Sequence, residues 1–258
     1  MTRTSVPNQT SQRIPPRRDD HPQDRRDAIV AAMSKSPANG RNQYRVATVV
    51  VLSLVVVGYV LISYGPLDPS ASRVGLRPGL GWHFPLLLTH IFAGAVALTL
   101  GPLQLLRRLR RRRLVHRYLG RVYLFAGVFP ASVAGIGLAM LTTAGPVAAA
   151  GLAVGDVLWF GTAVLGYRTA RAQRYRDHER WMLRNLALTF AAVTFRGWLG
   201  LFIALQLPWL GSVYGGDFGR LFHTAYDIAA WGAFIPNVAV VSLYLRAHSS
   251  RVPRSARL

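Results

Sequence analysis

Five histidines lie within or beside the apolar segments of the chain, and two of them begin the same short pattern. The pattern is a histidine followed by glycines four and eleven residues later, and it occurs at His90/Gly94/Gly101 and at His116/Gly120/Gly127. Imidazoles can bind haem iron or exchange protons near neutral pH. Because ionisable side chains are rare in membrane-spanning helices, those found there tend to mark functional sites. The repeated pattern is therefore the first indication of chemistry in this sequence.

A b-type haem held by two histidines needs one imidazole from each of two helices at the same membrane depth. At one face the predicted pair is His116 and His178. At the other face it is His90 with His223, or else His90 with His83. Haem b is thus the predicted cofactor, and haem iron is the only predicted metal. Transmembrane electron transfer is the first functional hypothesis.

Several arginines lie beside His116 and His178 in the sequence. They could bind the propionates of a haem, because guanidinium groups form bidentate hydrogen bonds with carboxylates. The predicted cofactor contacts are Arg121 and Arg184, with Arg117 and Arg180 near them. A redox partner or a quinone would then exchange electrons with the protein, which would be a redox protein without catalytic side chains. The alternative is that the four histidines contact only lipid, backbone or a helix end.

Three charged residues lie inside apolar segments: Asp156, Arg196 and Asp227. Unpaired charges are costly in a bilayer, so Arg196 is expected to neutralise one of the carboxylates. His223 and Asp227 are four residues apart and share a helix face. Together with His90 these residues predict a polar cavity, which supports a second hypothesis, a proton-coupled transporter of small molecules. A third is that the charges only hold the helices together, as in a membrane scaffold or assembly factor.

These side chains need helices to position them, and the apolar segments provide six. Roughly 20 apolar residues cross a bilayer as a helix, and the uncharged run Val46–Tyr64 is long enough to do so. The predicted spans cover residues 46–64, 85–106, 118–141, 147–167, 181–207 and 224–246. The predicted fold is therefore an all-α, multi-pass membrane helical bundle over residues 46–246. Pro130 and Pro236 are expected to kink the third and sixth helices.

The placement of basic residues predicts how the helices cross the membrane, since Lys and Arg concentrate on the cytoplasmic side. Lys and Arg together number 9 in residues 1–45, 8 in 107–121, 6 in 168–184 and 4 in 246–258. The alternate loops hold only Arg73, Arg77 and Arg220. Both termini are thus predicted to be cytoplasmic, in a protein of the cell membrane. His90 then lies toward the outer side and His116 toward the inner side.

The first 45 residues are rich in Pro, Arg, Ser and Asp and lack apolar periodicity, which predicts a disordered basic tail. Met33 is an alternative to Met1 as the translation start, and residues 247–258 form a second short basic tail. The net charge of +21 is spread between apolar segments, which favours contact with anionic lipids over nucleic-acid binding. The absence of cysteine excludes disulfides, iron–sulfur thiolate ligation and covalent c-type haem attachment.

Several of these residues carry a resemblance to a known family. The chain resembles an uncharacterised family of multi-pass membrane proteins, filed as domain of unknown function 2306, in five runs: His90–Gln104, His116–Tyr123, His178–Arg184, Ala187–Arg196 and Trp231–Asn237. The resemblance covers about residues 80–246 and implies a multi-pass fold but no particular activity. The spacing of His116, Gly120 and Arg121 is also similar to helix starts in cytochrome b561-type domains. That similarity implies two haems bound across the membrane.

Overall fold

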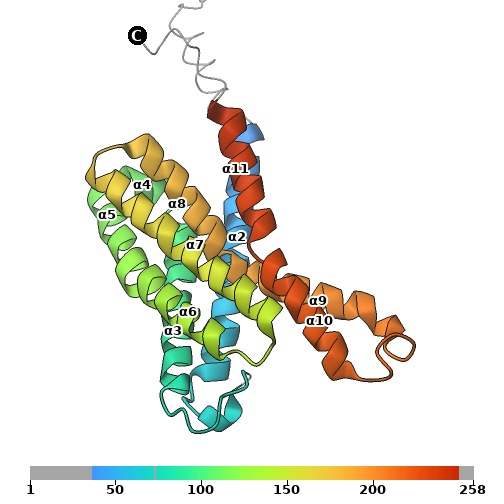
Figure 1. The fold of residues 1–258 in the computed structure, drawn as a ribbon. Helices are drawn as coiled ribbons and strands as arrows, with labels where there is room; N and C mark the ends of the chain where they lie inside the picture. The colour runs from blue at the N-terminus through green and yellow to red at the C-terminus, as the bar shows by residue number, and fades with distance from the viewer. Residues whose placement is uncertain (1–36, 73, 250–258) are drawn as a thin grey trace, which may run out of the picture. The chain divides into compact units, whose positions relative to one another are not determined.

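The computed structural model describes residues 37–72 and 74–249, and over those residues the chain is helical, with no strand (Figure 1). Residues 1–36 and 250–258, which hold most of the two predicted tails and both candidate start methionines, lie outside the described residues. The chain divides into two units, Met1–Arg45 and Val46–Leu258. The candidate membrane spans found among the described residues all lie in the second unit.

Six helical segments of the described chain are long and apolar enough to cross a membrane: Val46–Tyr64, His83–Leu103, Arg113–Leu141, Pro146–Arg171, Tyr175–Trp209 and Phe218–His248. The predicted number of spans is therefore confirmed. The helices are α2 (Pro37–Tyr64), α3 (His83–Leu103), α4 (Arg107–Arg111), α5 (Arg113–Val122), α6 (Phe129–Leu141), α7 (Pro146–Arg171), α8 (Tyr175–Thr189), α9 (Ala191–Gln206), α10 (Phe218–Gly232) and α11 (Ile235–Ser249). Short 3-10 turns, η1 (Pro69–Ala71) and η3 (Leu207–Trp209), follow α2 and α9. Because α2 begins at Pro37, residues 37–45 are helical rather than part of an irregular tail.

The third span contains an irregular turn next to a proline. α5 passes into a π-helical segment, η2 (Tyr123–Val128), before α6 begins at Phe129. Pro130, in the first turn of α6, has no N–H to donate, so the turn before it loses a regular helical hydrogen bond and widens. The irregularity predicted at Pro130 is thus a π-helical turn before the proline. The wide turn brings both Tyr123 and Val128 into the buried core.

The fifth and sixth spans are each broken into two helices. α8 gives way to α9 at Phe190, and α10 gives way to α11 between Gly232 and Ile235. Pro236 explains the second break, as predicted, because it cannot donate a backbone hydrogen bond in the first turn of α11. The break at Phe190 has no proline or glycine beside it and is not predicted by the sequence. Figure 1 shows α9 and α10 turned away together from the direction of α8 and α11, and the two pack on each other.

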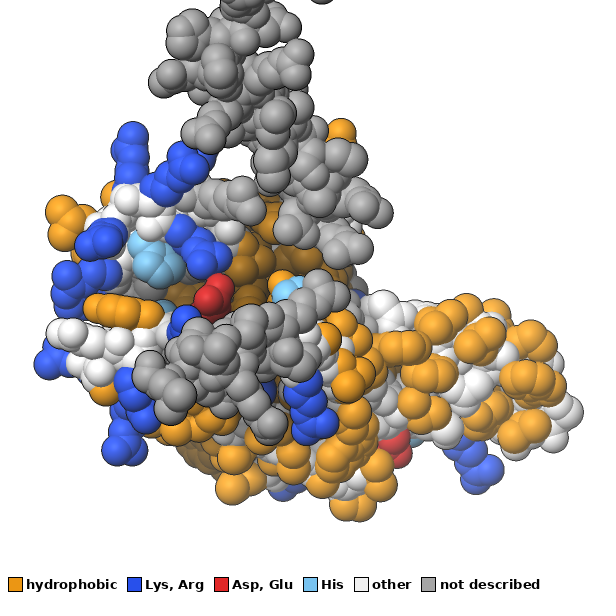
Figure 2. All heavy atoms as spheres, turned by 90° about the horizontal axis from the view of Figure 1, so that it is seen from above, with side chains coloured by type: hydrophobic (Ala, Val, Ile, Leu, Met, Phe, Trp, Pro, Cys, Tyr) orange, Lys and Arg blue, Asp and Glu red, His pale blue; other side chains and the backbone are white. Residues whose placement is uncertain are grey.

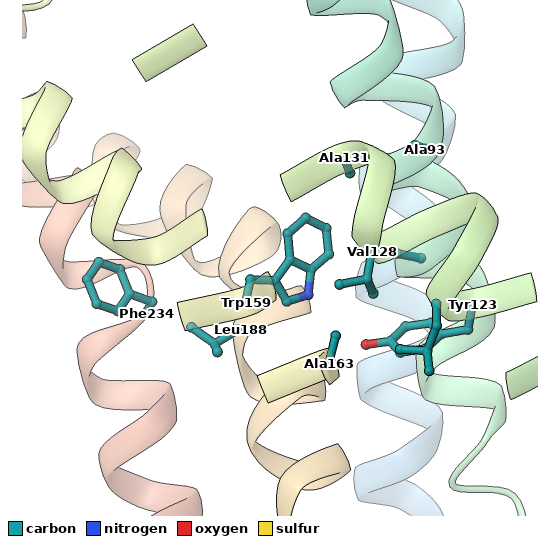
Figure 3. Close-up of a cluster of buried hydrophobic side chains, with 10 residues drawn as sticks. Ala93, Tyr123, Val128, Ala131, Trp159, Ala163, Leu188 and Phe234 are labelled. Carbon is teal, nitrogen blue, oxygen red and sulfur yellow. The ribbon is translucent and has the colours of Figure 1, made fainter. Parts of the chain in front are cut away.

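The main hydrophobic core lies where α3, η2, α6, α7 and α8 pack together. Its labelled members in Figure 3 are Ala93, Tyr123, Val128, Ala131, Trp159, Ala163, Leu188 and Phe234. The second glycine of each histidine–glycine pattern belongs to a helix contact near this core. A Cβ on Gly127 would lie 3.0 Å from the backbone nitrogen of Ala97, and one on Gly101 would lie 3.0 Å from the Tyr123 ring. These glycines therefore let α3 and η2 approach closely, and the space beside them is filled by protein.

Candidate functional site: an intramembrane cavity

An open cavity of about 610 Å³ lies between α2, α3, α6, α7, α9 and α10. It runs from the loop at Val74 and Gly75 to Trp159 and Leu188 in the middle of the bundle. Its walls are mainly apolar, and its volume falls in the range of about 300–1,000 Å³ that is typical of small-molecule sites. The cavity contains three of the five polar residues predicted to share one: His90, Asp156 and Arg196.

His90 connects α3 to α6 through one ring nitrogen. Its Nδ1 lies 2.9 Å from the carbonyl oxygen of Ala131. A carbonyl oxygen only accepts hydrogen bonds, so Nδ1 donates there and Nε2 keeps a lone pair. The imidazole is thus held in one orientation, with an Nε2 that can accept a proton or bind a metal ion.

Asp156 reaches the cavity from α7 by lying against a glycine of α6. A Cβ placed on Gly135 would overlap the Asp156 carboxylate, so the lack of a side chain at position 135 makes room for the acid. None of the ion pairs within the described residues includes Asp156. The carboxylate is therefore placed by packing and not by a basic partner.

Arg196, on α9, does not neutralise either carboxylate as the sequence predicted. Its Nη1 donates to the carbonyl oxygen of Ala192 at 2.6 Å, and its guanidinium lies 5.8 Å from the centre of the Tyr59 ring on α2. No ion pair of Arg196 occurs in the part of the chain that the structure describes. Arg196 is exposed although it lines the cavity, so the cavity is open at this residue.

α10 presents a different face to the cavity from the predicted one. Its lining residues are Phe222, Tyr226 and Ala230, and Ala233 lines the cavity just after the helix ends. His223 and Asp227 each follow a lining residue by one position, which rotates them by about 100° around the helix. His223 is exposed, and Asp227 Oδ1 is buried with no hydrogen-bond partner in the described structure. Neither residue is therefore among those that line the cavity with His90.

His83, the alternative partner of His90, is occupied by the loop before α3. It is 2% exposed, and its Nδ1 accepts a hydrogen bond from the backbone N–H of Arg77 at 3.0 Å. In a neutral ring Nε2 then carries the hydrogen and has no lone pair for iron. Among the described residues, His90 therefore has no second histidine beside it that could serve as the other axial ligand of a haem. The predicted haem site at this end of the bundle does not fit the residues present.

The other predicted histidine pair lies at the arginine-rich end, which comprises α4, the start of α5 and the start of α8. His178 Nδ1 donates to the carbonyl oxygen of Gly166 at 2.8 Å, which leaves Nε2 with its lone pair. His116 lies at this end of the bundle too, on α5, and its Nδ1 is buried without a partner among the described residues. Figure 2 looks onto this end, where basic side chains gather beside a histidine and an acidic side chain.

The two arginines predicted to hold haem propionates have different surroundings. Arg121 is exposed on α5. Arg184 is partly buried on α8, and its guanidinium lies 5.1 Å from the centre of the Trp181 ring. Arg180, beside them, pairs with Asp177 at 3.7 Å.

A buried hydrogen-bond network that the sequence analysis missed lies beside the cavity. The Tyr123 hydroxyl lies 2.5 Å from Asn185 Oδ1 and 2.7 Å from Thr189 Oγ1. Trp159 Nε1 donates to Thr189 Oγ1 at 2.9 Å, and both residues line the cavity. Asn185 Nδ2 donates to Thr162 Oγ1, also at 2.9 Å. The one signal for this network in the sequence is Asn185, an amide inside the predicted fifth span.

Comparison with known proteins identifies a family without assigning an activity. No curated protein and no solved structure matches the chain. The similarity to cytochrome b561-type domains therefore stays a prediction. The family model described as a predicted membrane protein (DUF2306) matches residues 87–245, which is more than half of the chain. The match includes His90, Asp156 and Arg196, and it runs from α3 into α11. The chain therefore belongs to the DUF2306 family of predicted membrane proteins.

Proposed function

We propose that this protein binds a small amphiphilic molecule in its intramembrane cavity and moves it across the membrane together with a proton. The observation that carries the proposal is that His90, Asp156 and Arg196 line one cavity of about 610 Å³. Ionisable residues are expensive within a bilayer, and in membrane proteins they mark substrate and proton pathways. A purely structural role would pair these groups with one another, whereas Arg196 pairs with neither carboxylate in the described structure.

His90 and Asp156 are the groups that would exchange the proton. His90 keeps a lone pair on Nε2 because its Nδ1 is occupied by the carbonyl oxygen of Ala131, 2.9 Å away. The Asp156 carboxylate makes no ion pair within the described residues, so it can take a proton or contact a ligand. A proton carried on either group would offset the charge of a bound ligand as that ligand moves.

The helix breaks beside the cavity give this transport a structural basis. α9 and α10 carry Arg196 and Tyr226, and a break separates each of these helices from the rest of its span. Discontinuous helices at the substrate site recur in secondary transporters. The α9–α10 pair would move as one unit against α3, α6, α7 and α8, and this movement would change the side to which the cavity opens.

The test uses purified protein in liposomes that enclose the pH-sensitive dye pyranine. A panel of small amphiphiles is added from outside under an imposed pH gradient, and proton movement is read from the dye. Wild-type vesicles should show ligand-dependent proton movement above that of protein-free vesicles. Asp156→Asn should abolish the protein-dependent part of the signal, because the amide cannot exchange a proton in this range.

Asp177→Asn is the matched control, since Asp177 is a surface carboxylate that pairs with Arg180 at 3.7 Å outside the cavity. This variant should behave as the wild type. The proposal is overturned if no member of the panel moves protons in wild-type vesicles. It is also overturned if Asp156→Asn keeps the full signal.

Electron transfer through a single haem b is the second candidate function, and one observation favours it. The hydrogen bond from His178 Nδ1 to Gly166 leaves Nε2 free, which is how proteins orient histidine ligands. His116 would be the second axial ligand, and Arg184 would contact a propionate. A bound haem would supply one-electron chemistry toward a redox partner or a quinone.

The test of this second candidate is an absorption spectrum of the purified protein. A Soret band that His178→Ala removes supports it. Protein expressed with adequate haem that lacks the band contradicts it.

A further inference from the structure

We propose that the ligand of the cavity is a single-chain carboxylate, with its head group on Arg196 and its apolar chain along the cavity wall. This inference deepens the proposed function and rests on the same cavity, but it concerns binding and not transport. It starts from Arg196, a charged side chain at the open edge of a mainly apolar space.

The guanidinium of Arg196 has hydrogen-bond donors to spare. Nη1 donates to the carbonyl oxygen of Ala192 at 2.6 Å, and the face of the Tyr59 ring lies 5.8 Å away. No carboxylate lies within 4.0 Å of Arg196 in the described part of the chain. A guanidinium has five N–H donors and stays charged. An anion brought by the ligand would satisfy these donors and neutralise a charge that hydrocarbon disfavours.

The charges around the cavity favour a head group with one negative charge. Arg196 is the only lysine or arginine among the described residues that line the cavity, and Asp156 lines it as well. One guanidinium neutralises one negative charge, and a second charge on the head group would face no further lysine or arginine among these lining residues. A carboxylate therefore fits better than a doubly charged phosphate monoester. It also matches the planar arginine fork with two parallel hydrogen bonds.

The apolar walls provide room for the chain of the ligand. α2 contributes three valines to the lining: Val56, Val57 and Val60. Ala192 and Val193 of α9 pack against an apolar cluster formed by Val56 and Val60 of α2 and Leu98 of α3. Because Arg196, one turn farther along α9, is exposed, the cavity opens where α9 meets α2. A carboxylate amphiphile dissolved in the bilayer would enter there, with its head group at Arg196 and its chain among the valines.

The ring of Trp159 lines the cavity, and its fluorescence provides the readout, because bromine atoms quench tryptophan emission on contact. Purified protein in detergent is titrated with stearic acid brominated in mid-chain. The wild type should show saturable quenching, and Trp159→Phe should lose most of it. Arg196→Gln should weaken binding about ten-fold or more, because a charge-assisted hydrogen bond is lost. Arg220→Gln, at an exposed arginine of α10 outside the cavity, should bind as the wild type does.

Competition then identifies the head group. Unbrominated stearic acid should displace the probe, whereas methyl stearate and octadecyl phosphate should each compete about ten-fold less well. Equal competition by the ester, stronger competition by the phosphate, or unchanged quenching in Arg196→Gln overturns the carboxylate assignment. Specific binding without proton movement in liposomes would overturn the transport proposal and leave this inference standing. Proton movement driven only by ligands that lack a carboxylate would overturn the carboxylate assignment and leave the transport proposal standing.

Discussion

At the scale of single residues, the glycines of the histidine–glycine pattern have two different surroundings. A Cβ at Gly127 would lie 3.0 Å from the backbone nitrogen of Ala97, whereas no atom lies within 4 Å of one at Gly120. We expect Gly127→Ala to lower the free energy of unfolding by about 1–3 kcal/mol, because two helices must separate to admit the methyl group. Gly120→Ala should leave stability unchanged or slightly higher, since alanine favours helix. Thermal unfolding in detergent measures both variants, and equal melting temperatures would contradict the close helix contact.

The contact between Gly135 and the Asp156 carboxylate can be tested by substitution. In Gly135→Ala the new methyl group would occupy the space of the Asp156 carboxylate, so that side chain must rotate away. The variant should still fold, because only the end of one side chain has to move, but its protein-dependent proton movement in liposomes should fall several-fold. Gly161→Ala, on the same helix as Asp156 and with no atom within 4 Å of its Cβ, is the control. A full signal in Gly135→Ala would show that the position of Asp156 does not matter.

The position of a charged residue within an apolar segment predicts its depth in the membrane. It does not predict whether the side chain points toward the cavity or away from it. His90, Asp156 and Arg196 were placed together by this reasoning, and all three line the cavity. His223 and Asp227 share a helix face, as their spacing predicts, yet the residues one position before each of them line the cavity instead. The polar stripe of α10 can be read from the sequence, but the neighbouring element that this stripe faces cannot.

At the scale of helices, the network around Tyr123 joins η2, α7 and α8. Tyr123→Phe removes a hydroxyl that lies 2.5 Å from Asn185 Oδ1 and 2.7 Å from Thr189 Oγ1. We expect the free energy of unfolding to fall by about 1 kcal/mol, because a buried amide oxygen loses its partner. Tyr118→Phe, at an exposed tyrosine of α5, should cause no change. The measurement is thermal unfolding of both variants in the same detergent, and equal midpoints would mean that the network does not stabilise the bundle.

Asn237 links the two helix breaks. Its Nδ2 lies 3.1 Å from the carbonyl oxygen of Ala187 in α8 and 3.0 Å from that of Ala233 beside α10. Asn237→Leu should therefore speed amide hydrogen exchange at both breaks and lower stability by about 1 kcal/mol. Gln104→Leu is the control, because both amide atoms of Gln104 are buried without a partner among the described residues. Unchanged exchange in Asn237→Leu, or an equal effect in the control, would argue against this link.

The six spans could be predicted because hydropathy over a window of about 20 residues reports whether a segment suits a bilayer. The breaks within the spans depend on partners from distant parts of the chain. Pro236 indicated one break by its missing N–H, but the break at Phe190 carries no such residue. Near it, Thr194 Oγ1 donates to the carbonyl oxygen of Ala233 at 2.6 Å, which helps to satisfy backbone groups across the two breaks. A contact between residues so far apart in the chain has no local sequence signal.

At the scale of the whole molecule, the two kinds of candidate chemistry lie at different ends of the bundle. The arginine-rich end contains His116 and His178, whereas the cavity with His90 reaches the loop between α2 and α3 at the opposite end. Since basic residues stay in the cytoplasm, the cavity is expected in the outer half of the membrane. An amphiphile in the outer leaflet could then reach Arg196 without passing the arginine-rich end of the bundle.

The absence of cysteine from the sequence makes this orientation directly measurable. Ser212→Cys places a thiol in the exposed loop between η3 and α10, and Ala172→Cys places one at the exposed end of α7. A membrane-impermeant maleimide added to intact cells should label Ser212→Cys, because that loop carries few basic residues and is expected outside. Ala172→Cys should be labelled only after the cells are opened, since it adjoins the basic segment 168–184. The reverse pattern would contradict the orientation predicted from Lys and Arg, and it would move the cavity and Arg196 to the inner half of the membrane.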